Sequence, residues 1–201
     1  MAEDAPISHT DERDRIRRHM KTRRAALGAR ERLEAGAGLA DVLLDHEPIR
    51  SAGSLAGYWS VGGEAPLHAL IPRLGTATRF HLPRLGDDGR LRFAPWRPGE
   101  PLEANRFGIP EPAVALSDCL DPDRIDIVLV PLLAFDPRGH RLGMGAGWYD
   151  RSFAGRRRQP PPPLLIGIGY AFQQVERIPD APHDVPLDLV ATERELHHCT
   201  G

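Results

Sequence analysis

Three glycines on alternate positions, Gly143, Gly145 and Gly147, are the residues of this chain whose type and spacing best suit chemistry. Glycine lets backbone N–H groups approach a phosphate without a Cβ in the way. An apolar run, 127–135, comes before them, and a plausible first helical turn, 148–151, follows. A helix start adds partial positive charge. The pattern indicates an anion cradle, although such glycines are also typical of a tight corner that binds nothing.

Charged side chains flank the three glycines. Arg138, Arg141 and Arg151 supply positive charge, and Asp150 is placed to hold Mg²⁺ against a bound phosphate. The loop is not a Walker A motif, because no Gly-Lys-Ser/Thr follows, and residue 148 is Trp, which excludes the dinucleotide fingerprint. We therefore favour phosphate binding over a bare corner.

Two buried strands are predicted to position this loop. The run 127–135, interrupted only by Pro131, is typical of a strand covered on both faces, and 164–170 is a second such run. Residues 136–139 predict a turn, with proline at its second position and glycine at its fourth. After the loop, we expect the helix to continue over 152–158.

The segment from Phe135 to Phe153, FDPRGHRLGMGAGWYDRSF, resembles the signature of the 5-formyltetrahydrofolate cyclo-ligase family, AFD-x-x-G-x-RLG-x-G-x-G-Y-YDR. The chain departs from it at Trp148, commonly Tyr, while Met144 and Ala146 fall where the family varies. The resemblance implies a catalytic role for Arg141 and a magnesium ligand in Asp150. It implies that ATP contacts Gly139, Arg141, Leu142, Gly143, Met144, Gly145, Ala146, Gly147, Trp148 and Tyr149. Residues 144–148 are also implied to contact the folate substrate.

A first helix is predicted from about residue 8 to Leu27, opened by a capping box of Ser8 and Asp11. It carries a basic stripe at helical spacing, which usually means a solvated charged face. The stripe consists of Arg13, Arg17, Lys21 and Arg24. The family has a Lys-x-x-x-Arg pair on this helix that reaches the nucleotide phosphates. Arg13 and Arg17 match that spacing, with arginine in place of the lysine, which keeps the charge and changes the geometry.

The folate side is expected near Glu64, between a predicted strand, 54–61, and a predicted helix, 66–74. A carboxylate near a helix start is a common cap and needs no function. The resemblance gives Glu64 a folate contact and catalytic role, through a YxS-x-x-x-E arrangement that begins at Tyr58. It also places Trp59 at the substrate, and an aromatic side chain suits the flat face of a pterin.

Three further segments complete the expected domain. A second helix, about 30–46, is predicted to end before Pro48, and residues 77–96 predict a hairpin about the turn 86–89. The stretch 105–112 resembles the N-x-x-G-I-x-E-P segment that borders the family's site, and its prolines predict extended chain.

A second magnesium ligand is implied near the carboxyl end of the chain. Residues 183–188 resemble an HD-x-P-x-D motif, in which an aspartate joins Asp150 at the magnesium ion. Asp184 is the better candidate, because it follows the histidine, and Asp188 is interpreted as the start of a last strand ending near residue 193.

Composition narrows the class of protein. The 201 residues predict one domain, with 1–8 as a flexible terminus and 9–201 as a three-layer α/β/α fold with a mainly parallel or mixed sheet. The net charge of −2 gives no case for a nucleic-acid or membrane partner. The two cysteines are interpreted as free thiols. We expect a cytoplasmic monomer without a membrane span.

These observations lead to a hypothesis about function. The resemblance implies an ATP- and magnesium-dependent ligase that converts 5-formyltetrahydrofolate into 5,10-methenyltetrahydrofolate, ADP and phosphate, in tetrahydrofolate interconversion. An alternative is a non-catalytic nucleotide- or folate-binding relative, which would have less reason to keep Glu64 and Trp59. A phosphosugar enzyme would explain the cradle but not the YDR and HD motifs together.

Overall fold

The computed structural model describes residues 9–200, so the predicted flexible terminus, 1–8, and the predicted cap Ser8 lie outside the described residues. A seven-stranded sheet has the order β11-β10-β9-β6-β1-β2-β3. Neighbours from β10 to β2 are parallel, and the edge strands β3 and β11 are antiparallel. The strands are β1 (Ser54–Ala56), β2 (Arg79–Leu85), β3 (Leu91–Pro95), β6 (Ile127–Pro131), β9 (Leu164–Ile168), β10 (Leu189–Ala191) and β11 (Leu196–His198). The predicted mixed, mainly parallel sheet is confirmed.

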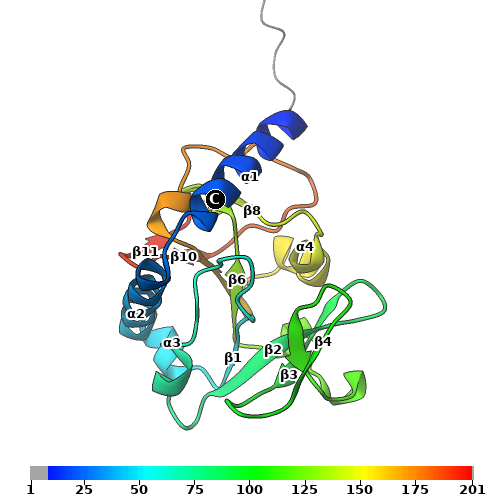
Figure 1. Cartoon of the computed structure of the whole chain (residues 1–201). Helices are drawn as coiled ribbons and strands as arrows, with labels where there is room; N and C mark the ends of the chain where they lie inside the picture. Colours follow the sequence, from blue (N-terminus) through cyan, green and yellow to red (C-terminus); the bar gives the residue numbers. More distant parts are fainter. Residues whose placement is uncertain (1–8, 201) are drawn as a thin grey trace, which may run out of the picture.

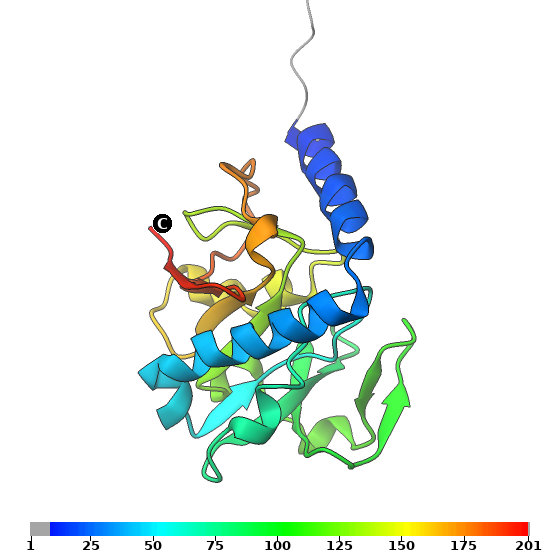
Figure 2. The same ribbon diagram turned by 60° about the vertical axis from the view of Figure 1, so that its left-hand side comes forward.

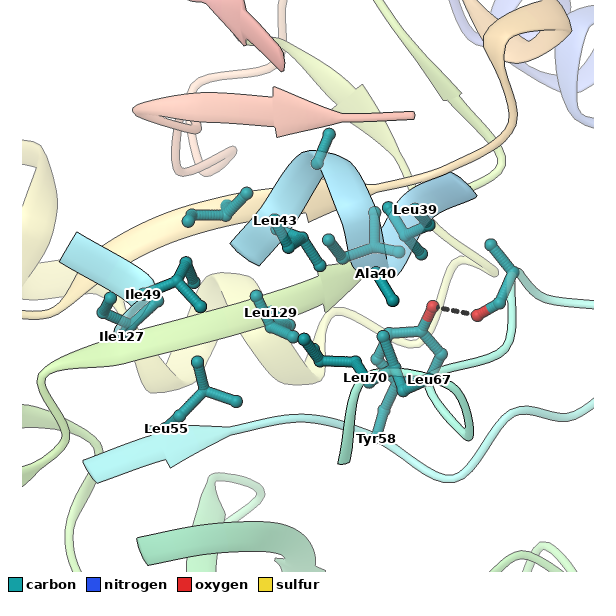
Figure 3. Packing of buried hydrophobic residues seen from close by; sticks show 14 of the residues in the cluster. Leu39, Ala40, Leu43, Ile49, Leu55, Tyr58, Leu67, Leu70, Ile127 and Leu129 are labelled. Carbon is teal, nitrogen blue, oxygen red and sulfur yellow. Dashed lines mark hydrogen bonds between the residues drawn. The ribbon is translucent and has the colours of Figure 1, made fainter. Parts of the chain in front are cut away.

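The central strand β6 is buried on both faces, as its apolar run predicts. Ile127 and Leu129 pack beneath α2 (Ala29–Asp45) and α3 (Glu47–Ser51), with Leu39 and Leu43 above them (Figure 3). The alternate residues of β6 face the opposite core, beside Phe153, which directly follows α4 (Trp148–Ser152). Figure 1 shows α2 and α3 on one side of β6 and α4 on the other. The layers therefore follow the predicted α/β/α order.

Helix α1 (His9–Ala25) stands beyond the end of the sheet (Figures 1 and 2). Its buried Met20 packs in a small core with Leu142 and Ile178, beneath a separate two-stranded ribbon. That ribbon pairs β7 (Ala134–Phe135) with β8 (Arg141–Leu142). The ribbon thus carries the chain from the central sheet to the glycine loop, with α1 packed against it.

Several predicted elements are shorter than their patterns indicate. The predicted strand 54–61 ends at Ala56. The run 127–135 divides after Pro131, since proline has no N–H to continue a ladder. The predicted helix 66–74 is wrong: only Ile71–Arg73 form a 3₁₀ turn, and Pro72 within it cannot donate an α-helical bond. The predicted helix over 152–158 is also wrong, because α4 ends at Ser152 and a 3₁₀ turn, Ala154–Arg157, follows.

The segments beyond β3 form short elements. The predicted hairpin of β2 and β3 is confirmed, and residues 105–109 are the tip of a second hairpin, β4 (Leu102–Ala104) with β5 (Pro110–Pro112). Two 3₁₀ turns, Leu116–Asp118 and Pro122–Arg124, lead to β6. Pro48 lies in the first turn of α3, so a new helix starts where the previous one ends.

The structure bears on two predictions made from composition, the state of the cysteines and the presence or absence of a membrane-spanning helix. Cys119 and Cys199 are free thiols, as expected. No helix in residues 9–200 is both long and apolar enough to cross a membrane.

Candidate active site

One cavity, of about 430 Å³, gathers most of the side chains predicted to act. It lies where the segments that follow β1 and β6 leave the sheet, between α1, the glycine loop and the β4–β5 hairpin. Crevices beyond the carboxyl ends of parallel strands are the usual ligand sites of such sheets. Its lining includes Arg13, Arg17, Trp59, Glu64, Arg141, Gly143, Met144, Gly145, Ala146, Gly147, Trp148, Tyr149, Asp150 and Asp184.

The glycine loop joins β8 to α4 and forms one wall of the cavity. Gly145 has φ +100° and Gly147 has φ +67°, values that strongly favour glycine. A Cβ on Gly143 or Gly145 would meet nothing within 4 Å. Helix α4 has only five residues, so the partial positive charge predicted at its start contributes little to anion binding. The open space beside Gly143 and Gly145 fits an anion cradle better than a packed corner.

Helix α1 brings two arginines to the loop. Arg17 donates from Nε to the Gly143 carbonyl at 3.2 Å and pairs with Asp14 at 2.6 Å. Arg13 lies one turn away, and its fork binds both carboxylate oxygens of Asp184, at 2.7 and 3.2 Å. Arg13 also donates to the Pro179 carbonyl at 2.7 Å. The shared wall of the cavity brings these two residues together as the sequence spacing predicts.

Arg141 is buried at the floor of the cavity, beside Asp150. Its Nη2 donates to Asp150 Oδ1 at 2.7 Å, and its Nη1 donates to the Val185 carbonyl. The Val185 N–H also donates to Asp150 Oδ1, at 3.1 Å. A guanidinium held on both sides presents its remaining donors in a fixed direction, which suits recognition of a phosphate.

The two carboxylates predicted to hold magnesium line the same cavity. Asp150 is engaged through Oδ1, whereas Arg13 takes both oxygens of Asp184. Across residues 9–200 no three His, Cys, Asp or Glu side chains form a group able to hold a metal ion. Mg²⁺ is commonly bound by one or two carboxylates together with substrate phosphates, rather than by a protein cage. The donor set fits an ion that arrives with a polyphosphate, and Asp150 is the more available ligand.

Glu64 lies in a turn, not at a helix start. It accepts a hydrogen bond from the Val61 N–H at 3.2 Å, and its own N–H donates to the Val61 carbonyl at 3.1 Å. Since residues 66–74 form no α-helix, the cap interpretation of Glu64 is wrong. Burial raises the pKa of the Glu64 carboxyl, and the Val61 bond and the Arg24 charge oppose this rise. A carboxylate kept in such a place is a candidate ligand contact.

Aromatic side chains surround the mouth of the cavity. Trp59 is 38% exposed and meets Trp96 edge to face, with ring centroids 5.9 Å apart. Across the mouth, Phe107 at the tip of the β4–β5 hairpin meets Trp148 at 6.5 Å, and Arg106 lies over both rings. These surfaces suit a flat heterocycle.

Gly139, Leu142 and Asp188 are among the motif residues that lie outside the cavity lining. Gly139 is the turn between β7 and β8, with φ +87°, against the Leu187 carbonyl. Leu142 is fully buried beneath α1. Asp188 binds Arg156 through both oxygens, at 2.7 and 2.8 Å, and accepts from the Leu165 N–H. These residues shape the fold around the site.

Arg24 and Phe107 are two of the lining residues to which the sequence analysis assigned no individual role. Arg24 belongs to the basic stripe of α1, yet it is 3% exposed and faces the cavity. Its spacing from Arg13 and Arg17, on one helical face, was the available signal. Phe107 gave no signal beyond its place in the 105–112 stretch.

Comparisons with known proteins agree on one family. A model of the 5-formyltetrahydrofolate cyclo-ligase family matches residues 9–193. The chain is 35% identical to the 5-formyltetrahydrofolate cyclo-ligase of Haemophilus influenzae, covering 89% of this chain and 96% of the relative. Identity to the Escherichia coli protein of the same name is also 35%, covering 88% and 98%. The NMR structure of Aquifex aeolicus 5,10-methenyltetrahydrofolate synthetase superposes with a TM-score of 0.79 at 27% identity, covering 94% of this chain and 93% of that one.

Proposed function

Because the chain belongs to the 5-formyltetrahydrofolate cyclo-ligase family, we propose that its cavity converts 5-formyltetrahydrofolate and ATP into 5,10-methenyltetrahydrofolate, ADP and phosphate. The observation that carries this proposal is the convergence of an anion cradle and a partly buried carboxylate in one cavity. The Gly143–Gly147 loop and Arg141 form the cradle, and Glu64, in the same lining, supplies the carboxylate. A nucleotide and a folate can therefore meet there.

The reaction requires activation of a poor leaving group. The formyl oxygen attacks the γ-phosphorus of ATP, and the bond to ADP breaks. Folate N10 then bonds to the activated carbon, its proton is lost, and the former formyl oxygen leaves within the phosphate. Phosphoryl transfer of this kind depends mainly on alignment and on neutralising charge. No nucleophile from the protein is needed.

The glycine loop and the arginines bind and align the phosphates in this proposal. In this role the backbone N–H groups of residues 143–147 donate to the phosphates, which occupy the open space beside Gly143 and Gly145, while Arg17 holds the loop through the Gly143 carbonyl. Arg141, locked by Asp150, donates to the transferring group. When bound, Mg²⁺ supplies further neutralisation of phosphate charge, and Asp150 and Asp184 are the residues that would hold it.

The folate is oriented from the opposite wall. The Glu64 carboxylate accepts hydrogen bonds from N–H groups of the pteridine, and Trp59 and Trp148 lie beside its flat face. Even a small displacement of the formyl oxygen from the γ-phosphorus would slow the first step steeply. This proposal is supported by the positions of Glu64 and the glycine loop, which line one cavity and would contact the two substrates.

The direct test is formation of the methenyl product, followed by its absorbance, with and without ATP and magnesium. We expect product only when both are present. A purified, folded protein that binds ATP and forms no product from 5-formyltetrahydrofolate would favour the non-catalytic binding protein.

A further inference from the structure

Arg24 is a buried cation on α1 for which the proposed mechanism has no use. It is 3% exposed, and its Nε and Nη1 have no hydrogen-bond acceptor among the described residues. Its Nη2 reaches the Met144 sulfur at 3.9 Å, and a thioether is only a weak acceptor. Buried donors are normally satisfied, and the described residues give Arg24 no side-chain acceptor stronger than this sulfur.

The turn that carries Glu64 lies directly against Arg24. A Cβ on Gly62 would be 3.5 Å from Arg24 Nη2, and one on Gly63 would be 3.4 Å from the Arg24 side chain. Both glycines have positive φ, 56° and 79°, which lets the turn approach this closely. The Tyr170 hydroxyl fixes the turn by donating to the Gly63 carbonyl at 3.1 Å. Arg24 and Glu64 thus lie side by side in one wall of the cavity.

The other titratable groups around this pair come from four segments. Arg32 on α2 donates to the Arg24 carbonyl at 3.4 Å and adds a second positive charge. Burial raises the pKa of three neighbouring tyrosines, so they remain neutral: Tyr58, Tyr149 and Tyr170. Burial also lowers the pKa of Arg24, and the Glu64 charge opposes this change. The Glu64 carboxylate and the Arg24 guanidinium therefore lie beside neutral hydroxyls and one further positive charge, that of Arg32.

We propose that Arg24 and Glu64 together read the amide edge of the folate's pteridine ring. Glu64 accepts from the ring N–H and the 2-amino group, and Arg24 Nη2 donates to the adjacent 4-oxo oxygen. This inference rests on the proposed function, because the folate substrate supplies that edge. It makes Arg24 a specificity-determining residue of the folate side of the cavity.

The Met144 sulfur is the group that a ligand oxygen would replace. Met144 is 56% exposed and lies in the glycine loop, so its flexible side chain can leave without disturbing the core. A carbonyl oxygen is a stronger acceptor than a thioether, and a charged donor strengthens the bond further. A 4-amino group at the same place would instead set donor against donor.

The test compares the affinities of 5-formyltetrahydrofolate and its 4-amino analogue, measured by calorimetry with the full chain. We expect the parent to prefer the 4-oxo compound by about tenfold or more. Arg24→Met should lose the part of this preference that Arg24 supplies, while ATP affinity is kept. The rest of the preference comes from Glu64, because the 4-amino compound also lacks the ring N–H that Glu64 accepts. Arg23→Met is the matched control, because Arg23 is exposed and donates to the Phe172 carbonyl outside the cavity; it should behave like the parent.

A second readout separates a charge effect from a structural one. Glu64 must be ionised to accept, so kcat/KM falls as the pH falls through the pKa of Glu64. Removing the Arg24 charge raises that pKa further, and the acid limb of the profile should move to higher pH in Arg24→Met. Arg24→Lys keeps the charge, but its shorter side chain ends before the position of Nη2. It should therefore keep the parental acid limb and lose the same part of the 4-oxo preference as Arg24→Met.

The outcomes distinguish the two proposals. A parent that binds neither folate contradicts the proposed function and the inference with it. A parent that turns over 5-formyltetrahydrofolate while either Arg24 variant keeps the full 4-oxo preference contradicts the inference alone. The lysine variant decides the question even if the methionine variant fails to fold.

Discussion

At the scale of single residues, the carboxylates of Asp136 and Glu64 differ in how much of their hydrogen-bonding capacity the fold satisfies. Asp136 is fully buried and accepts from the Arg138, His140 and Ile178 N–H groups, so its bonding is satisfied within the fold. Within residues 9–200 the Glu64 carboxylate accepts one hydrogen bond, from the Val61 N–H, and its pKa is raised by burial. Unsatisfied polar capacity beside a cavity is what a binding site needs and a core does not.

Glu64→Gln should reduce folate turnover by roughly 100-fold, because the amide would misplace the formyl oxygen. The folded pKa of Glu64 is raised, so its charge lowers stability at neutral pH. The neutral amide should therefore leave the melting temperature unchanged or slightly higher. Steady-state rates, ATP affinity and thermal melting check this prediction. Full activity in the variant would remove the folate contact.

Asp150→Asn and Asp184→Asn should each raise the magnesium concentration needed for half-maximal turnover. The effect should be larger for Asp150, because Arg13 already engages both oxygens of Asp184. Asp180→Asn is the control, since Asp180 pairs with Arg138 away from the cavity. Activity is measured against magnesium concentration for all three variants. Unchanged magnesium dependence in both cavity variants would exclude these carboxylates as the metal site.

At the scale of elements, the glycine loop is the part whose backbone geometry matters most. The loop connects β8 to α4. Arg17 donates to its Gly143 carbonyl at 3.2 Å, and Arg151 donates to its Ala146 carbonyl at 2.9 Å. Both bonds use carbonyl groups of the loop, so they occupy none of its backbone N–H groups.

Gly145→Val should abolish measurable ATP binding, because a branched side chain would enter the open space and disfavour φ +100°. Gly99→Val is a matched control: Gly99 has φ +95° and open space around it, in a turn distant in sequence from the loop. Both variants should lose about 1–2 kcal/mol of stability from backbone strain. Calorimetric titration with ATP distinguishes them. Normal ATP affinity in a folded Gly145→Val would mean that the glycines serve only the corner.

At the scale of the whole molecule, stability is linked to pH through a histidine within the sheet. His81 on β2 is 2% exposed, and its Nδ1 has no partner among the described residues. Burial lowers its pKa below the ordinary value of 6.5, although backbone hydrogen bonds oppose this. The unfolded chain therefore binds a proton at a higher pH than the folded chain does.

Because the unfolded state binds more protons below that ordinary pKa, the free energy of unfolding should fall as the pH falls through it. The loss is at most about 1.4 kcal/mol per pH unit and ends at the folded pKa. Urea unfolding between about pH 5 and 8 measures it. His81→Gln should flatten the decline, while the exposed His19→Gln should not. Equal slopes in His81→Gln and the parent would contradict this linkage.

The sequence by itself determined the features that are encoded locally. The apolar run at 127–135 predicted the central strand, because a strand covered on both faces has no polar side. The glycines at 143–147 predicted the cradle, because positive φ favours glycine at any position in any fold. These signals, with the motif around them, were enough for the fold class and the family.

Only the tertiary structure decided which charges meet. Arg13 and Asp184 are 171 residues apart, and the Arg13 guanidinium donates to both carboxylate oxygens of Asp184. Arg24, in the same basic stripe, is buried beside Glu64 instead of facing water. Glu64 lies beside a turn that Tyr170, 107 residues away from Gly63, holds through the Gly63 carbonyl. The physical reason is common to all three. A side chain's partners and burial depend on segments brought together by packing, and local periodicity carries no record of them.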